Sequence, residues 1–207
     1  GIPENKLRIR EHDESELAHY AKKTSDIEFE YPWGWGELEG IANRGNYDLN
    51  AHQESSGKDL RYFDPNSDNK FTPSVIEPAG GLTRTLFAVL LSLYEEEELE
   101  KEVRTLFKFK FDLAPIQIGI LPLSKKEELI EVCNSVKSEL GPYFRTEIDV
   151  TQSIGKRYRR QDEIGTPYCI TVDFDTLEDK AVTVRDRDSM SQERIKIEDI
   201  KSYFDNM

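Results

Sequence analysis

The sequence is poor in cysteine and histidine and lacks any long apolar run. Cys133 and Cys169 are the two cysteines, far apart and without the short spacing of metal ligands. This argues against a zinc site or a disulfide scaffold and favours a reduced, cytoplasmic protein. His12, His19 and His52 are scattered, so we interpret them as packing or surface residues rather than catalytic ones. No stretch could span a bilayer and no signal-peptide pattern occurs, so no membrane partner is expected.

Positive charge is also scarce, with 28 Lys and Arg against 41 Asp and Glu and a formal net charge of −13. An acidic surface repels nucleic acid, so any RNA contact has to depend on a local basic cluster. The 207 residues exceed the usual size of one domain, and 10 Phe with 9 Tyr can fill two modest cores. The chain opens Gly1-Ile2-Pro3 without an initiator Met, and we expect it to begin inside a larger protein.

The most informative stretch runs from Val75 to Leu86, where an apolar strand leads through a proline and two glycines into a helix. Pro78 cannot donate to a strand ladder, and Gly80 and Gly81 tolerate backbone angles closed to other residues. We therefore expect the strand to end here and the helix to begin at a bend. Apolar residues at helical spacing predict a buried stripe on this helix: Leu82, Leu86, Val89, Leu90 and Leu93.

Arg84 precedes most of that stripe and is expected to lie near the bend. A helix start and a planar guanidinium both favour phosphate, and Glu77 supplies the opposite charge for an amine. The same pattern also occurs as a simple connector with a solvated arginine, so the local pattern alone leaves both interpretations open.

A second stretch, Trp33 to Arg44, contains a predicted strand from Glu37 to Asn43. Gly40 and Ala42 are small and leave space for a ligand on one face of this strand. Glu37 and Glu39 stand at i, i+2, which predicts that both carboxylates point to the same side, where they either hold Mg²⁺ or face water. Exposure to water is the preferred interpretation for Glu39.

The rest of the first 112 residues predicts a mainly antiparallel α+β domain. We expect a capping-box helix from Asp13 to Lys23, a half-buried strand from Ile27 to Tyr31 and a helix from Asn46 to Ser56. Two antiparallel strands, Leu60 to Phe63 and Phe71 to Ile76, are expected around a strong turn signal. The domain's last helix is expected to finish in the solvated run Glu95 to Glu98, followed by a connecting strand over 103–109.

Residues 113–207 predict an α/β domain with a mixed sheet, because strands and helices alternate before a final hairpin. The expected elements are a strand over 116–121, a helix opened by a capping box at Ser124 and closed by Gly141, a strand over 144–150, a helix from Ser153, strands over 168–174 and 181–187, and a last strand and helix.

Four basic residues stand within five positions near the start of one of these helices, with an aromatic between them: Lys156, Arg157, Tyr158, Arg159 and Arg160. Such a group can hold phosphates while the ring stacks on a base. It can equally be a basic helix face paired with Asp162 and Glu163. The alternating run from Arg185 to Asp188 is better interpreted as a strand end with cross-strand ion pairs.

Three stretches, Trp33 to Arg44, Val75 to Arg84 and Gly155 to Pro167, together resemble glycyl-tRNA synthetase of the dimeric class II type. The resemblance covers essentially the whole chain. The motif Gly81-Leu82-Thr83-Arg84 looks like the third class II signature, whose arginine holds the ATP γ-phosphate. The first two signatures are absent, so the resemblance implies the C-terminal half of such an enzyme.

The resemblance implies the C-terminal part of a class II antiparallel-sheet catalytic domain over 1–112 and an α/β anticodon-binding domain over 113–207. The implied activity is that of a glycine–tRNA ligase, which forms glycyl-adenylate from glycine and ATP with Mg²⁺ and transfers the glycyl group to the 3′ end of glycine tRNA. The intact enzyme is expected to be a cytoplasmic homodimer, and this piece alone is expected to be inactive. The alternative is a non-catalytic RNA- or partner-binding protein, like the accessory subunit of mitochondrial DNA polymerase.

The resemblance also assigns roles to residues. Arg84 and Glu37 would be catalytic, and Glu37 is the candidate protein ligand for ATP-bound Mg²⁺. The implied ATP-binding residues are Glu37, Leu38, Gly81, Leu82, Thr83 and Arg84. The implied glycine-binding residues are Arg44, Glu77, Pro78, Ala79, Gly80 and Gly81. The implied tRNA-binding residues are Lys156, Arg157, Tyr158, Arg159 and Arg160. Ala79 departs from the serine common in the family, which removes one hydroxyl near the amine.

Overall fold

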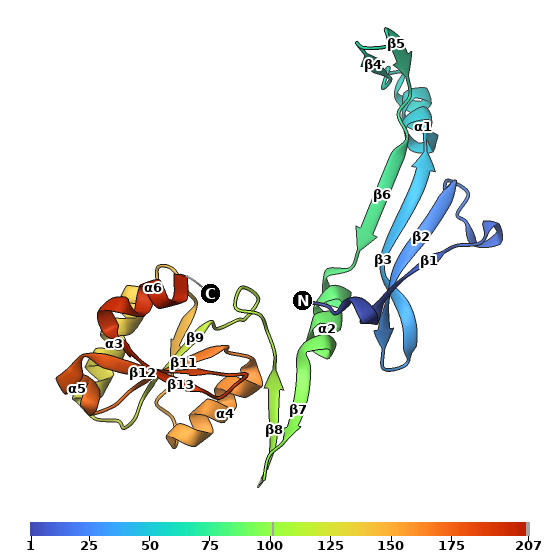
Figure 1. Cartoon of the computed structure of the whole chain (residues 1–207). Helices are drawn as coiled ribbons and strands as arrows, with labels where there is room; N and C mark the ends of the chain where they lie inside the picture. Colours follow the sequence, from blue (N-terminus) through green and yellow to red (C-terminus); the bar gives the residue numbers. More distant parts are fainter. Residues whose placement is uncertain (101, 206–207) are drawn as a thin grey trace. The chain divides into compact units, whose positions relative to one another are not determined.

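The computed structural model describes residues 1–100 and 102–205, which form two compact units (Figure 1). The first unit is Ile2–Ser92, and the second comprises the chain from Leu93 onward together with Gly1. The boundary between the units lies between Ser92 and Leu93, earlier than the expected boundary at 112/113. The segment after Leu93 forms a hairpin, and Arg104 of this hairpin bonds Asp162 of the second unit. Within the described ranges, no helix is both long and apolar enough to cross a membrane.

The first unit is built on a four-stranded antiparallel sheet in the order β1-β2-β3-β6. Its strands are β1 Leu7–Glu11, β2 Lys23–Tyr31, β3 Gly34–Gly45 and β6 Val75–Gly80, with the short 3-10 helix η1 Glu4–Lys6 before β1. The strands predicted at 27–31 and 37–43 are confirmed and are longer than expected. A small core on one face of the sheet contains Phe29, Tyr31, Leu38 and Ala88.

A β-bulge at Leu38 corrects the expectation that Glu37 and Glu39 point to the same side. Glu28 pairs with Glu37 while Ile27 pairs with Glu39, so β3 has one extra residue between them. As a result, Oε1 of Glu37 lies 3.3 Å from where a Cβ on Gly40 would stand, whereas Glu39 lies beside Gly80. The i, i+2 argument fails here because it assumes an unbroken pleat.

The strand β6 does not end at Pro78 as predicted; it continues to Gly80. The sheet tolerates Pro78 because β6 is an edge strand and pairs only with β3. Gly80 and Gly81 are also absent from the described residues that have positive φ, so neither uses the backbone freedom that was expected of it.

Helix α2, Leu82–Leu93, follows directly and confirms the predicted helix start. Its predicted buried stripe is wrong at the first two positions, because Leu82 is 85% exposed and Leu86 is 56% exposed. The helix buries Ala88 instead, and Leu91 packs against the same core.

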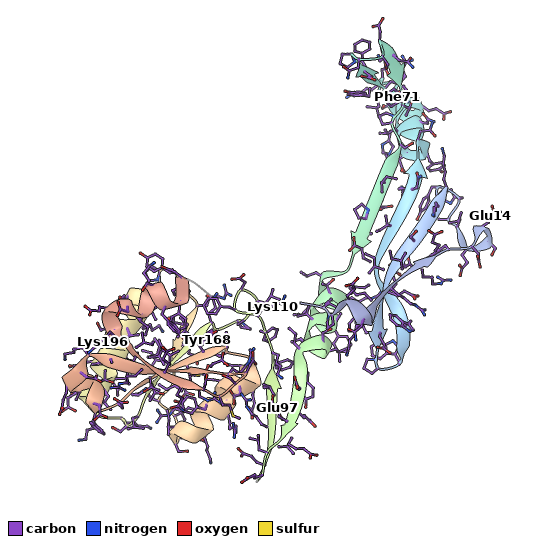
Figure 2. All side chains as sticks on the ribbon, in the orientation of Figure 1. Glu14, Phe71, Glu97, Lys110, Tyr168 and Lys196 are labelled. Carbon is purple, nitrogen blue, oxygen red and sulfur yellow. The ribbon has the colours of Figure 1, made fainter. Side chains whose placement is uncertain are left out.

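Between β3 and β6 the chain leaves the sheet as an excursion over 46–74 (Figure 1). Its elements are α1 Tyr47–Ser56, ended by Gly57 in the left-handed conformation, and a short hairpin of β4 Tyr62–Asp64 and β5 Asn69–Phe71. Figure 2 labels Phe71 at the far end of this excursion. The predicted second strand over 71–76 is split, since Phe71 pairs within the hairpin and Val75 pairs with β3.

The predicted helix from Asp13 to Lys23 is wrong. The capping box of Asp13 and Glu16 is present, but it closes only the 3-10 turn η2 Glu14–Glu16. Beyond it, the Tyr20 ring packs beneath Arg44 and Lys23 begins β2. Tertiary contacts therefore override the local start signal.

The second unit begins with a hairpin of β7 Tyr94–Glu98 and β8 Val103–Phe107, labelled at Glu97 in Figure 2. The acidic run was predicted to end a helix, but it forms a strand that pairs with β8, and cations from β8 and from the residue after it lie against its carboxylates. Arg104 Nη1 lies 2.8 Å from Glu97, and Lys108 Nζ lies 2.7 Å from Glu95.

The rest of this unit is a five-stranded mixed sheet in the order β10-β9-β11-β12-β13, which confirms the predicted architecture. Its elements are β9 Ile118–Pro122, α3 Glu127–Leu140, β10 Thr146–Ile148, α4 Ile154–Ile164, β11 Tyr168–Val172, α5 Asp175–Asp179, β12 Ala181–Asp186, β13 Gln192–Lys196, η3 Ile197–Asp199 and α6 Ile200–Asp205. Helix α3 begins after Lys126 rather than at Ser124, so the predicted capping box is wrong.

Helices cover both faces of this sheet. Ile118 and Ile120 of β9 pack in one core with Leu129 of α3 and Phe204 of α6. Gly119 faces the other way and leaves room for Gln161 of α4, whose Oε1 lies 3.0 Å from where a Cβ would stand. Helix α4, which contains the predicted basic cluster, therefore has one side against the sheet.

Candidate functional site

The strands of the first unit place a network of charged side chains on one face of the sheet. Arg8 Nε donates to Glu28 at 2.6 Å, and His12 Nε2 lies 2.6 Å from Asp26. Asp26 and Glu28 are only 7% and 8% exposed. These four residues were not predicted as part of a site, although alternation of charged and apolar residues in β1 and β2 could have placed Arg8, Asp26 and Glu28 on one face; His12 follows β1.

Arg84 reaches β3 from the first turn of α2. Its Nη1 donates to the backbone oxygen of Glu37 at 2.8 Å and lies 3.9 Å from the carboxylate Oε2 of the same residue. About half of each side chain remains exposed, 53% for Arg84 and 52% for Glu37. The two residues predicted as catalytic are therefore neighbours with solvent-accessible charges.

An open cleft of about 360 Å³ adjoins this pair. It is lined by Tyr31, Trp33, Gly36, Glu37, Thr83, Arg84 and Phe87. The rings of Tyr31 and Trp33 are stacked with centroids 5.0 Å apart, and Phe87 lies 6.2 Å from Tyr31 in a nearly parallel orientation. The buried Tyr31 hydroxyl has no hydrogen-bond partner among the described residues, and burial raises its pKa. A cleft with a cation, a carboxylate and aromatic walls suits a nucleotide.

Arg44 and Glu77 form a second charged group on the same sheet. Arg44 Nη1 donates to Glu77 at 2.6 Å, while its Nε and Nη2 bond Asp48 of α1 at 2.7 and 2.8 Å. The guanidinium also lies over the Tyr20 ring at 3.9 Å. These bonds, first to Asp48 and then to Glu77, raise the pKa of Arg44, and the bond to Arg44 lowers the pKa of Asp48.

The strand register separates the predicted glycine-binding residues between two faces. Glu77 pairs with Ala42, and Ala79 pairs with Gly40. Residues that pair directly across two strands lie on the same face of the sheet. Glu77 and Ala79 therefore lie beside Ala42 and Gly40, on the face that also holds the Glu37 side chain. Pro78 pairs with Ile41 and Gly80 pairs with Glu39, so both residues belong to the opposite face of the sheet. They therefore cannot line the same site as Glu77 and Ala79 through that face.

Two predicted ATP-binding residues also need correction. Leu38 is 8% exposed and belongs to the core, so only its backbone can contact a ligand. Leu82 is exposed but does not line the cleft beside Arg84, whereas Thr83 does. Across residues 1–100 and 102–205, no three His, Cys, Asp or Glu side chains are grouped so that they could hold a metal ion.

The predicted basic cluster of the second unit is partly internal. Arg157 is 3% exposed and donates to the carbonyl oxygens of Pro122 and Gln152. The Tyr158 hydroxyl bonds Thr171, and Arg160 bonds Asp149 at 2.6 Å. Arg157 is therefore a structural residue and not a surface contact for RNA.

Asp162 is the centre of this internal network. Its carboxylate accepts from Arg104 at 2.8 Å and from Arg185 at 3.1 Å, and Arg159 lies 3.3 Å away. Asp162 and Arg104 are both fully buried. Burial alone would lower the pKa of Arg104, but its bonds to Asp162 and Glu97 outweigh burial and raise it. The predicted ion pairs of Arg185 are thus made with α4 and not across strands.

Lys156, Arg159 and Arg160 of the cluster face solvent at least in part, and Arg160 is 38% exposed beside its partner Asp149. Lys156 is exposed and has no ion pair or side-chain hydrogen bond to another described residue. Arg159 is partly exposed and bonds Glu102 through Nε at 2.8 Å. Both line an open cleft of about 530 Å³, which is also lined by Arg185 and Gln192.

Known proteins resemble this chain over both units. Residues 117–207 match the family model described as an anticodon binding domain. The glycine–tRNA ligase of Lachnospira eligens is 56% identical over 207 residues, which is 100% of this chain. The chain belongs to the glycine–tRNA ligase family. The glycine–tRNA ligases of Clostridium acetobutylicum and Bacillus cereus are 54% and 51% identical over 206 and 205 residues. The chain spans 44% of the length of each of these ligases.

The fold has a counterpart among solved structures. The structure of prolyl-tRNA synthetase from Cryptosporidium parvum, complexed with L-proline and AMP, matches with a TM-score of 0.68. The match covers 97% of this chain and 41% of that chain at 20% sequence identity. The antiparallel sheet followed by a mixed α/β unit is therefore a synthetase fold of class II, as predicted for this glycine–tRNA ligase family member.

Proposed function

We propose that this chain is the C-terminal part of a glycine–tRNA ligase and supplies one side of its adenylation site together with its anticodon-binding unit. The observation that carries the proposal is that Arg44 bonds Glu77 on the face of Glu37 while Arg84 bonds the Glu37 backbone, in a chain that is 56% identical over its full length to a glycine–tRNA ligase. In the proposed reaction, the glycine carboxylate attacks the α-phosphate of ATP, pyrophosphate leaves, and the glycyl group then passes to the 3′ end of glycine tRNA.

Arg84 and Glu37 would bind the phosphate end of ATP. The Arg84 guanidinium donates one hydrogen bond to the Glu37 backbone oxygen and exposes its remaining N–H groups. These groups can donate to a phosphate without first breaking a buried ion pair. Glu37 is the nearest carboxylate and would bind the Mg²⁺ that accompanies ATP. A fixed cation at the leaving phosphates acts by stabilising charge that develops in the transition state.

Glu77 would bind the glycine ammonium. Its Oε2 already accepts from Arg44, and its side chain is 45% exposed, so the other carboxylate oxygen can accept from the amine. Ala79 and Ala42 lie beside it on the same face. Their methyl groups leave a shallow site, which suits an amino acid without a side chain.

Lys156 and Arg159 would contact tRNA, since both are cations of the basic cluster that line the larger open cleft of this unit. Charges beyond about 8 Å are largely screened at physiological salt, so these cations can bind phosphate despite the acidic total. We extend the proposal to a cytoplasmic, homodimeric enzyme that uses ATP with Mg²⁺.

Glycine-dependent ATP–pyrophosphate exchange by the complete ligase that contains this chain tests the proposal. Replacing Arg84 with Ala should lower the exchange rate by about 100-fold or more. Arg61→Ala is a matched control, because Arg61 is an equally exposed arginine of the same unit that pairs with Asp59 in the excursion. Near-normal exchange in the Arg84 variant would refute its role. No exchange by the unmodified ligase would favour the non-catalytic binding protein instead.

A further inference from the structure

Asp48 lies next to the proposed glycine site and is not one of its proposed ligands. It stands in the first turn of α1, four residues after Arg44, which lies near the end of β3. The two oxygens of Asp48 accept from Nε and Nη2 of Arg44 at 2.7 and 2.8 Å. Two parallel bonds of this kind fix the plane of a guanidinium as well as its position. The Asp48 side chain is 25% exposed, so the pair is partly shielded from water.

Two further contacts hold the same guanidinium. The Tyr20 ring lies beneath it at 3.9 Å, and Nη1 donates to Oε2 of Glu77 at 2.6 Å. Because Asp48 occupies the edge formed by Nε and Nη2, that edge is closed to Glu77, which receives a single bond from Nη1. The Glu77 side chain is 45% exposed and keeps its other oxygen for a ligand.

The charges of this group do not balance. Arg44 supplies one positive charge, whereas Asp48 and Glu77 supply two negative charges, and Arg44 is the cation that pairs with both carboxylates in the described part of the chain. The bond to Arg44 lowers the pKa of Asp48, so Asp48 keeps its charge at neutral pH. A pair of Arg44 with Glu77 alone would be neutral and would attract an ammonium only weakly. With Asp48 present, the group keeps one net negative charge, and Glu77 is its more exposed carboxylate.

We propose that Asp48 is a positioning residue for glycine: it binds one edge of Arg44, orients the guanidinium and leaves Glu77 charged for the glycine ammonium. The inference rests on the proposed function, in which Glu77 binds that ammonium. Asp48 touches neither the substrate nor the reacting atoms and acts through Arg44. Because Asp48 belongs to α1, the start of the excursion over 46–74 becomes part of the amino-acid site.

The test uses the complete ligase with Asp48→Asn, which keeps the shape and one acceptor but removes the charge. In glycine-dependent ATP–pyrophosphate exchange, the KM for glycine should rise about ten-fold, because a carboxylate charge close to the amine is lost. The KM for ATP should stay within about two-fold, since ATP is bound at a separate cleft beside Arg84. The control is Glu54→Gln in the same helix, because Glu54 is exposed and makes no ion pair with another described residue. Both KM values of this control should stay within about two-fold of the unmodified ligase.

A double variant separates positioning from a general structural role. In the Glu77→Gln background, Asp48→Asn should change the KM for glycine by no more than about two-fold, because Asp48 acts through Glu77. An equal rise in both backgrounds, an unchanged KM for glycine, or equal rises for glycine and ATP would each overturn the inference. A KM for glycine that does not respond to Glu77→Gln would overturn the proposed role of Glu77 and the inference with it. Absence of exchange in the unmodified ligase would overturn the proposed function itself.

Discussion

Replacing Asp162 with Asn should strongly destabilise the second unit. This carboxylate is fully buried and accepts from Arg104 and Arg185, with Arg159 beside it. The amide is similar in shape but has no charge and turns one acceptor into a donor that faces guanidinium groups. Removing one partner from a buried ion pair costs about 3–5 kcal/mol. For a unit of this size, that loss lowers the melting temperature by roughly 12 °C or more.

Thermal unfolding followed by two signals provides the assay. Both tryptophans, Trp33 and Trp35, lie in the first unit, so their fluorescence reports on that unit, while far-UV circular dichroism reports on both. The dichroism transition that belongs to the second unit should move to lower temperature in Asp162→Asn. The control is Glu163→Gln, because Glu163 is exposed and makes no ion pair with another described residue, and it should change stability by at most about 0.5 kcal/mol.

A shift below about 0.5 kcal/mol in Asp162→Asn would refute the reasoning. It would mean that the buried arginines find other acceptors, so the network would not hold the hairpin β7–β8 against α4.

Three other predictions concern the proposed glycine site, the basic cluster of α4 and the two buried thiols. In the complete ligase, Glu77→Gln should raise the KM for glycine in pyrophosphate exchange much more than the KM for ATP; equal effects on both would indicate a folding defect. Lys156→Ala should leave stability unchanged and reduce the salt dependence of tRNA binding by about one phosphate contact, whereas Arg157→Ala should destabilise the fold; the reverse pattern would restore Arg157 as an RNA contact. Burial raises the pKa of the Cys133 and Cys169 thiols to about 12, so both should resist a thiol reagent at pH 8 until the protein unfolds, and unfolding should become easier as the pH rises above about 9, where only the unfolded thiols ionise. Rapid labelling of the native protein would contradict this burial.

The sequence predicted most elements whose patterns are continuous. Alternation marks the strand that ends at Tyr31, and a single glycine marks the end of α1 at Gly57. The strand–helix alternation after Leu113 likewise predicted the mixed sheet. The pattern also placed Arg84 in the first turn of the helix after this strand, whereas its contact with Glu37 was suggested only through the roles that the resemblance implied.

Other features depend on partners that are distant in the sequence. The helix expected after Asp13 is replaced by contacts that Tyr20 makes with Arg44. Asp26 is buried beside His12, which lies 14 residues earlier in the chain, and no pattern in the sequence marks this pair. A basic run such as that around Arg157 looks the same whether its helix side faces water or a sheet, so only the fold distinguishes the two.

The end of the β3–β6 ladder has a further consequence for how the excursion can evolve. This ladder closes where Gly45 pairs with Val75, so the excursion over 46–74 leaves and rejoins the sheet at adjacent positions. Because its ends are already joined, the length of the β4–β5 hairpin is not constrained by the ladder. Relatives can therefore lengthen, shorten or exchange the tip of the excursion while α1 stays in place, which makes that tip a tolerant point for inserting a label or a small domain.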